Sequence, residues 1–141
     1  MIVKLTKYED IKIGQKVEIL HVITDDDIQK FGDLSGDYNP LHFNETWAKK
    51  TMFGSRIAHG LLTASFISTA IGMHLPGPGT IYMSQSMRFL KPVRIGDSIT
   101  TNVEVIRLDD EKRRVILRTT CLNQDGVLVL DGEAMVTLMD L

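Results

Sequence analysis

Cysteine is nearly absent from this 141-residue chain, in which Cys121 is the single thiol. An internal disulfide is therefore excluded, and the chain fits a reducing compartment. Cys121 lies in an apolar, alternating run from Val115 to Leu122, which predicts a buried, inert thiol rather than a nucleophile. The first residues carry charges every few positions and include no apolar secretory core, so we expect a cytoplasmic protein.

A strong excess of positive charge is also missing, because the formal net charge is -2. This argues against a nucleic-acid-binding protein with a basic face. The charge is nevertheless uneven, since the segment between Thr46 and Gly96 has no acidic residue and carries +6, and the remainder carries -8. The six basic residues are Lys49, Lys50, Arg56, Arg88, Lys91 and Arg94. Either this segment attracts an anionic partner, or basic residues merely flank a buried helix.

No charged residue at all occurs between Arg56 and Arg88, and residues 61–75 (LLTASFISTAIGMHL) have no polar face. A helix of that length would be only ~22 Å long, short of the ~30 Å hydrocarbon core of a membrane. Its hydroxyl-bearing residues lower the hydrophobicity further. The stretch therefore predicts a helix that protein encloses on nearly every side, and no membrane span.

Alternating apolar and polar residues predict strands before and after this helix. The expected strands are 15–23, 80–89, 98–108, 113–123 and 127–138. Thr24, followed by three Asp residues, predicts the N-cap of a first helix, and Asn44 predicts the N-cap of a short second one. We expect one α+β domain over residues 1–141, in which an antiparallel sheet curls around the apolar helix.

The segment 35–42 reads SGDYNPLH and places Asp37 and His42 on either side of a turn signal. These two residues would lie ~17 Å apart in an extended chain and about 140° apart around a helix. Gly36 and Pro40 instead favour a turn that directs both side chains toward one small molecule. The alternative is an Asx-turn, in which Asp37 bonds backbone amides and His42 is exposed or satisfied elsewhere.

The segment 57–61 (IAHGL) places Gly60 where the apolar helix begins. Unpaired amides at a helix N-terminus can hold a carbonyl oxygen that acquires negative charge. It is equally possible that Gly60 only permits close packing and that His59 is an N-cap residue.

Four segments in order, 35–42, 57–65, 75–82 and 89–97, resemble the MaoC-like dehydratases. Within that family the chain is most similar to the (R)-specific enoyl-CoA hydratases, from about residue 8 to the C-terminus. The resemblance implies a hot-dog fold, in which a curved antiparallel sheet wraps one long central helix. It also implies a homodimer whose two sheets join edge to edge.

The resemblance further assigns catalysis to Asp37 and His42, and implies that the Gly60 amide polarises a thioester carbonyl. Ser68 falls on the helix serine that borders the acyl pocket in the family. The implied reaction adds water to a trans-2-enoyl thioester, and both CoA and acyl carrier protein remain open as its carrier. We expect no cofactor and no metal.

Other functions remain open. A hot-dog acyl-CoA thioesterase could use Asp37 to activate water against the thioester carbonyl, and a non-catalytic acyl-thioester-binding module would turn nothing over. A metal site made of Asp37, His42 and His59 is disfavoured, because no metalloenzyme spacing occurs. His21 and His74 belong to no motif and are expected to be structural or exposed.

Overall fold

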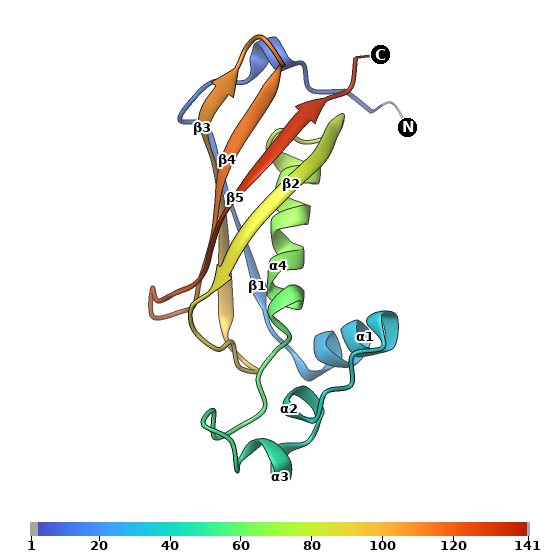
Figure 1. Ribbon diagram of the computed structural model, residues 1–141, viewed down its shortest axis with the longest axis vertical. Coiled ribbons are helices and arrows are strands. Elements are labelled where there is room, and N and C mark those ends of the chain that lie inside the picture. Colours follow the sequence, from blue (N-terminus) through green and yellow to red (C-terminus); the bar gives the residue numbers. More distant parts are fainter. Residues whose placement is uncertain (1–2, 141) are drawn as a thin grey trace.

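Five antiparallel strands form one sheet in the order β1-β3-β4-β5-β2 (Figure 1) in the computed structural model, which describes residues 3–140. The strands are β1 (Lys16–Val22), β2 (Thr80–Phe89), β3 (Ser98–Asp109), β4 (Arg114–Leu122) and β5 (Leu128–Leu138). Each lies within one residue of a predicted range at both ends. The predicted α+β class and antiparallel sheet are confirmed.

The sheet buries one face against a helical rod that runs along it (Figure 1). The rod consists of α4 (Gly60–Thr69) and a π-helical continuation, η2 (Ala70–His74), which together match the predicted apolar helix. Its core residues Ile67, Ala70 and Ile71 are at most 1% exposed. The strand residues in the same core include Ile99, Val103, Val105, Val115, Leu117, Leu130 and Val136. No helix in the described part of the chain is long and apolar enough to cross a membrane.

One side of the rod is open to solvent in the single chain. The exposed residues of the rod are Leu61, Ser65, Ser68, Thr69, Met73 and His74. The expectation that protein encloses this helix on nearly every side is therefore wrong for one chain. The physical reason is that the five strands of one chain cover only one side of the rod.

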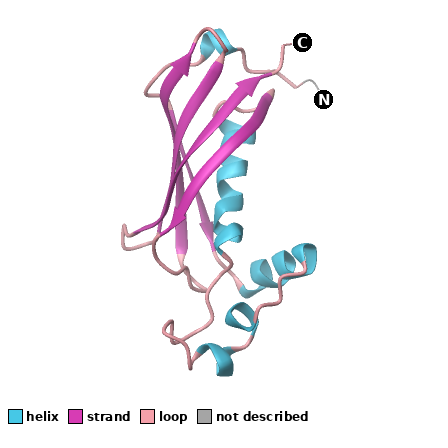
Figure 2. Ribbon diagram, viewed as in Figure 1, coloured by secondary structure: helices cyan, strands magenta, loops and turns pink. Residues whose placement is uncertain are grey.

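Three short helices gather near the N-terminal end of α4 (Figure 2). They are α1 (Asp25–Ser35), α2 (Pro40–Phe43) and α3 (Glu45–Ala48), and a 3-10 turn, η1 (Tyr8–Asp10), precedes β1. The predicted caps are confirmed, because the Thr24 side chain accepts from the Asp27 amide in a capping box and the Asn44 side chain accepts from the Trp47 amide. The sequence predicts only a turn between Asp37 and His42, where the structure has helix α2.

Gly132 marks a close approach between β5 and β2. A Cβ atom at this position would lie 2.1 Å from the backbone carbonyl oxygen of Ser86 on β2. This distance is far below van der Waals contact, and backbone cannot move aside as a flexible side chain can. The absence of a side chain at residue 132 therefore lets β2 pair with β5 as it does.

We expect Gly132→Ala to lower the free energy of unfolding by about 1–3 kcal/mol, because the added methyl group pushes β2 away from β5. Urea unfolding followed by circular dichroism measures the change. Glu133→Ala, at the next position, is the control and should change the stability by less than about 0.5 kcal/mol. Equal stability of Gly132→Ala and the wild-type protein would show that the strands adjust to the extra group.

Candidate active site

Asp37 and His42 come together because the chain turns sharply between them. The Asn39 side chain caps α2 by accepting from the Leu41 amide, and Pro40 occupies the first helical turn. Asn39 itself has φ -50° and ψ 128°, outside the helical region, as its position before a proline predicts. The turn therefore places Asp37 just before α2 and His42 within it.

His42 is a buried histidine with a fixed tautomer. Its side chain is held at Nδ1, which donates to the backbone carbonyl of Ile57 at 2.8 Å. Because a carbonyl only accepts hydrogen bonds, the ring hydrogen lies on Nδ1 and Nε2 keeps its lone pair. Burial lowers the pKa of His42, although the bond to Ile57 partly opposes this shift. His42 is therefore favoured in the neutral form that can accept a proton.

Arg56 fixes the main chain of His42 by a further hydrogen bond. Its Nε donates to the His42 carbonyl at 2.7 Å, and its guanidinium forms an ion pair with Asp25 at 2.6 Å. Asp25 is the first residue of α1, so Arg56 joins α1 to α2. Only 15% of the Arg56 side chain is exposed.

Asp37 is exposed in the single chain, and one of its carboxylate oxygens is engaged locally. Oδ1 accepts from the Asn39 amide at 3.1 Å, so the predicted alternative of an Asx-turn is also present. A carboxylate oxygen of Asp37 and one ring nitrogen each from His42 and His59 all lie within 4.8 Å of one another. One water molecule that makes two hydrogen bonds of about 2.8 Å can bridge such a separation.

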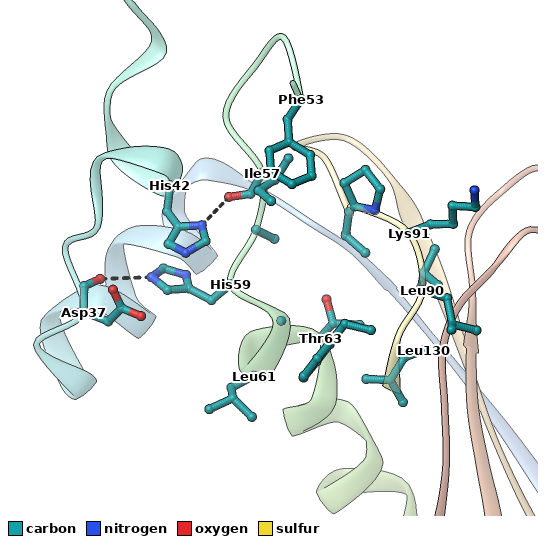
Figure 3. Close-up of a pocket in the computed structure, with 16 residues that line it drawn as sticks. Asp37, His42, Phe53, Ile57, His59, Leu61, Thr63, Leu90, Lys91 and Leu130 are labelled. Carbon is teal, nitrogen blue, oxygen red and sulfur yellow. Dashed lines mark hydrogen bonds between the residues drawn. The ribbon is translucent and has the colours of Figure 1, made fainter. Parts of the chain in front are cut away.

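His59 completes this group and is 2% exposed (Figure 3). Its Nε2 donates to the backbone carbonyl of Asp37 at 3.0 Å, and its ring stacks on that of His42 with centroids 4.0 Å apart. His59 is the N-cap residue of α4, as one alternative from the sequence predicts, although its side chain makes no capping hydrogen bond. The only signal in the sequence was its place directly before Gly60.

The three side chains do not have the geometry of a metal centre. Nδ1 of His42 and Nε2 of His59 are each engaged by a carbonyl oxygen, which leaves one lone pair on each ring. These lone pairs lie in ring planes that stack at only 29° to each other. Metal coordination requires lone pairs that converge on one point, and nearly parallel, stacked planes do not converge. The arrangement favours proton handling.

A pocket of about 390 Å³ adjoins this group. Asp37, His42 and Gly60 all contribute to its wall, so three of the four predicted site residues are brought together. The remaining wall is mostly apolar and includes Phe53, Ile57, Phe89, Leu90, Pro92, Val93 and Leu130. Such a cavity suits an apolar chain that carries one polar reacting group.

The position of Gly60 is compatible with both roles that the sequence leaves open. It is the first residue of α4, where backbone amides have no carbonyl partner within the helix. A Cβ atom on Gly60 would lie 2.7 Å from the Phe89 ring, so the glycine also allows close packing. Thr63, one turn further along, lines the same pocket, and its buried hydroxyl has no partner among the described residues.

Ser68 is not brought to this pocket. It is exposed on the open side of α4, eight positions after Gly60, or about 12 Å along the helix axis. Its predicted place beside an acyl chain thus has no support from the pocket of a single chain.

The other singled-out residues are buried, structural or exposed. Cys121 is fully buried, as predicted, and burial raises the pKa of its thiol. His21 bonds Asp27 at 2.8 Å and stacks on Phe66, and His74 is exposed. None of these three residues lines the pocket.

Comparisons with known proteins show which family the chain belongs to. Residues 9–125 match the model of the MaoC like domain. The chain is 50% identical to the (R)-specific enoyl-CoA hydratase of Rhodospirillum rubrum, over 92% of this chain and 89% of that protein. It is 47% identical to the 3-hydroxybutyryl-CoA dehydratase of Methylorubrum extorquens, over 92% of this chain and 82% of that one.

Among solved structures, the unliganded R-hydratase PhaJ1 of Pseudomonas aeruginosa superposes with a TM-score of 0.90 at 42% identity. That match covers 97% of this chain and 88% of the other. The predicted hot-dog fold is confirmed by this agreement. The chain therefore belongs to the MaoC-like dehydratase family.

Proposed function

We propose that this protein is an (R)-specific enoyl-CoA hydratase, which reversibly adds water to a trans-2-enoyl-CoA to give an (R)-3-hydroxyacyl-CoA. The observation that carries the proposal is the meeting of Asp37, His42 and Gly60 at one largely apolar pocket. The carboxylate and imidazole can handle the protons of water, and the helix N-terminus can hold the developing negative charge. The hydratase and dehydratase relatives support the same chemistry.

In the proposed mechanism, Asp37 and His42 orient one water molecule against the β-carbon of the enoyl group. Nε2 of His42 has the free lone pair, and the lowered pKa of His42 keeps that lone pair available near neutral pH. As the water oxygen bonds to the β-carbon, a proton passes to the acid-base pair. The pair then returns this proton to the α-carbon, so that the water adds as OH at the β-carbon and as H at the α-carbon.

Electron density moves from the double bond to the thioester oxygen during this step. The Gly60 amide at the start of α4 is the proposed donor to that oxygen, assisted by the positive end of the helix dipole. In other enzymes one such donor contributes ~3–4 kcal/mol of transition-state stabilisation.

The substrate is an acyl thioester with an anionic carrier. Lys91 lines the pocket and supplies a positive charge beside its apolar wall (Figure 3). This placement supports binding of the phosphates of CoA, and it suits the phosphopantetheine of an acyl carrier protein as well. A cytoplasmic location is in keeping with the single, buried thiol of the chain.

A homodimer is part of the proposal, because the single chain leaves two apolar surfaces uncovered. The edge strand β2 exposes Ile81, Tyr82 and Met83 at 40–43%, and the open side of α4 exposes Leu61 at 59%. A strand edge with free backbone groups is a surface that natural proteins cover or pair. Pairing of β2 with its copy would extend the sheet across two chains.

Asp37→Asn and His42→Ala are each expected to lower the hydration rate of crotonyl-CoA by at least ~10², because each removes a proton-handling group. The loss of enone absorbance measures hydration, and a thiol reagent detects any released CoA. His74→Gln, at an exposed histidine outside the pocket, is the control. Near-normal turnover of either variant would remove that residue from the mechanism, and CoA release by the wild-type protein would indicate a thioesterase instead.

The activity should fall on the acid side with a midpoint below pH 6.5, the ordinary pKa of histidine. Burial lowers the pKa of His42, so the neutral base persists to lower pH than in an unperturbed histidine. His59 and Arg56 act in the same direction and Asp37 opposes them. Values of kcat/KM for crotonyl-CoA between pH 4.5 and 8 test this, and a midpoint at or above 6.5 would contradict it.

The protein should sediment at twice its chain mass of 15.8 kDa. We expect Ile81→Lys to shift the protein toward the mass of one chain, because a lysine in the paired edge would be buried without a partner. Ile106→Lys, on β3 away from the sheet edges, is the control and should leave the dimer intact. A monomeric wild-type protein with full activity would rule out the dimer.

A further inference from the structure

We propose that His59 is a positioning residue that holds the Asp37 main chain and the His42 ring in the arrangement that proton transfer requires. This inference rests on the proposed hydratase function, to which it adds a third residue. His59 contacts both members of the acid-base pair, through a hydrogen bond to one and a ring stack with the other.

The hydrogen bond to Asp37 is the first contact that carries the proposal. The other hydrogen bonds of Asp37 reach only two residues along the chain, to the Ser35 hydroxyl and from the Asn39 amide. Such bonds shape the turn without fixing its distance from α4. The bond from His59 Nε2 to the Asp37 carbonyl spans 22 positions, and it is the one hydrogen bond that ties Asp37 to a distant segment within residues 3–140.

The ring stack with His42 is the second contact. Centroids 4.0 Å apart and an interplanar angle of 29° leave little freedom for the His42 ring to tilt on that side. Phe31 and Phe43 contact His59 on other sides, with centroids 4.7 and 5.6 Å away. This aromatic cage sets the direction of the His59 N–H bond, and thereby the place where the Asp37 carbonyl must lie.

An imidazole is suited to this position because it combines a flat face with a hydrogen-bond donor in the ring plane. Phenylalanine would keep the face and lose the donor, whereas glutamine would keep a donor and lose the stacked ring. The remaining nitrogen of His59, Nδ1, is buried without a partner among the described residues. An unpaired buried polar atom is costly, so the ring is not explained by its contribution to packing alone.

The same residue joins the acid-base pair to the amide donor, because His59 is followed directly by Gly60. The oxygen-binding end of α4 and the Asp37 turn are therefore linked through one side chain and one peptide bond. A shift of the His59 ring would change the distance between the activated water and the polarised carbonyl.

Two variants test the two contacts of His59 separately. His59→Phe removes the hydrogen bond to Asp37, and His59→Gln removes the ring stack with His42. His59→Phe and His59→Gln should each lower kcat for crotonyl-CoA by ~10- to 100-fold with KM within about threefold, because misplacement of reacting groups slows the chemical step more than binding. His74→Gln should match the wild-type protein, and circular dichroism should show that all variants are folded. A kcat within about twofold of wild type for both His59 variants would overturn the proposal.

A double variant shows whether His59 acts by positioning Asp37 or contributes to catalysis independently of it. If His59 acts through Asp37, adding His59→Phe to Asp37→Asn should cost little further activity, because interactions that act as a unit are not additive. Losses that multiply in the double variant would overturn the proposal. A wild-type protein without hydration activity would instead contradict the proposed function.

The ring nitrogen of His59 that carries the hydrogen can be identified in the wild-type protein, so this test needs no variant. Nitrogen-15 NMR of the wild-type protein should show one histidine with its hydrogen on Nε2 and protected from solvent exchange, assigned to His59 by its proximity to the Phe31 and Phe43 rings. A hydrogen on Nδ1 of His59 would exclude the bond to Asp37 and with it the proposal.

Discussion

The site depends on one pairing of loop segments, in which hydrogen bonds with residues 56–59 hold residues 37–42 in place. Four hydrogen bonds cross between them. They join Arg56 Nε to the His42 carbonyl, the Ile57 amide to the Leu41 carbonyl, His42 Nδ1 to the Ile57 carbonyl, and His59 Nε2 to the Asp37 carbonyl. Their lengths are 2.7, 3.3, 2.8 and 3.0 Å. Three of the four use a backbone carbonyl of the Asp37–His42 segment as acceptor, so the segment is held mainly by its main chain, and its reactive atoms remain free.

Residues 56–59 are themselves held by the apolar rod of α4 and η2, which follows them in the chain. Ile67 and Ile71 are fully buried against the sheet, and burial of each such side chain contributes about 1.5–3 kcal/mol. With those residues seated against the sheet, α4 cannot slide without opening a cavity, so Gly60 and the residues before it have a fixed position. The Ala58 amide adds a bond of 2.7 Å to the Val93 carbonyl. Packing in the core thus fixes the position of a loop region that contributes little to the core itself.

Much of the fold follows from local sequence patterns, and the site follows from them only in part. Alternation located the strands, and the caps at Thr24 and Asn44 marked helix starts, because both signals arise from neighbours in the chain. The turn between Asp37 and His42 was predictable for the same reason. The contacts of His59 are not predictable in this way, because a ring stack across 17 positions is set by tertiary packing. The enclosure of α4 was overestimated because composition shows that a helix is apolar but not how many strands one chain supplies to cover it.

The hydrogen bonds of Asp37 and His42 indicate how the two side chains would orient one water molecule bound between them. Nδ1 of His42 is bound to a carbonyl, so the ring offers one acceptor, Nε2. Oδ1 of Asp37 accepts from the Asn39 amide, so Oδ2 is the oxygen that the turn leaves unoccupied. A water molecule has two hydrogens, and two acceptors within bridging distance would engage both. The lone pairs of that water would then be directed away from both side chains, which is the orientation that addition to a β-carbon in the adjoining pocket requires. Backbone hydrogen bonds at His42 Nδ1, which donates, and at Asp37 Oδ1, which accepts, would thus select the water orientation as well as the side-chain positions.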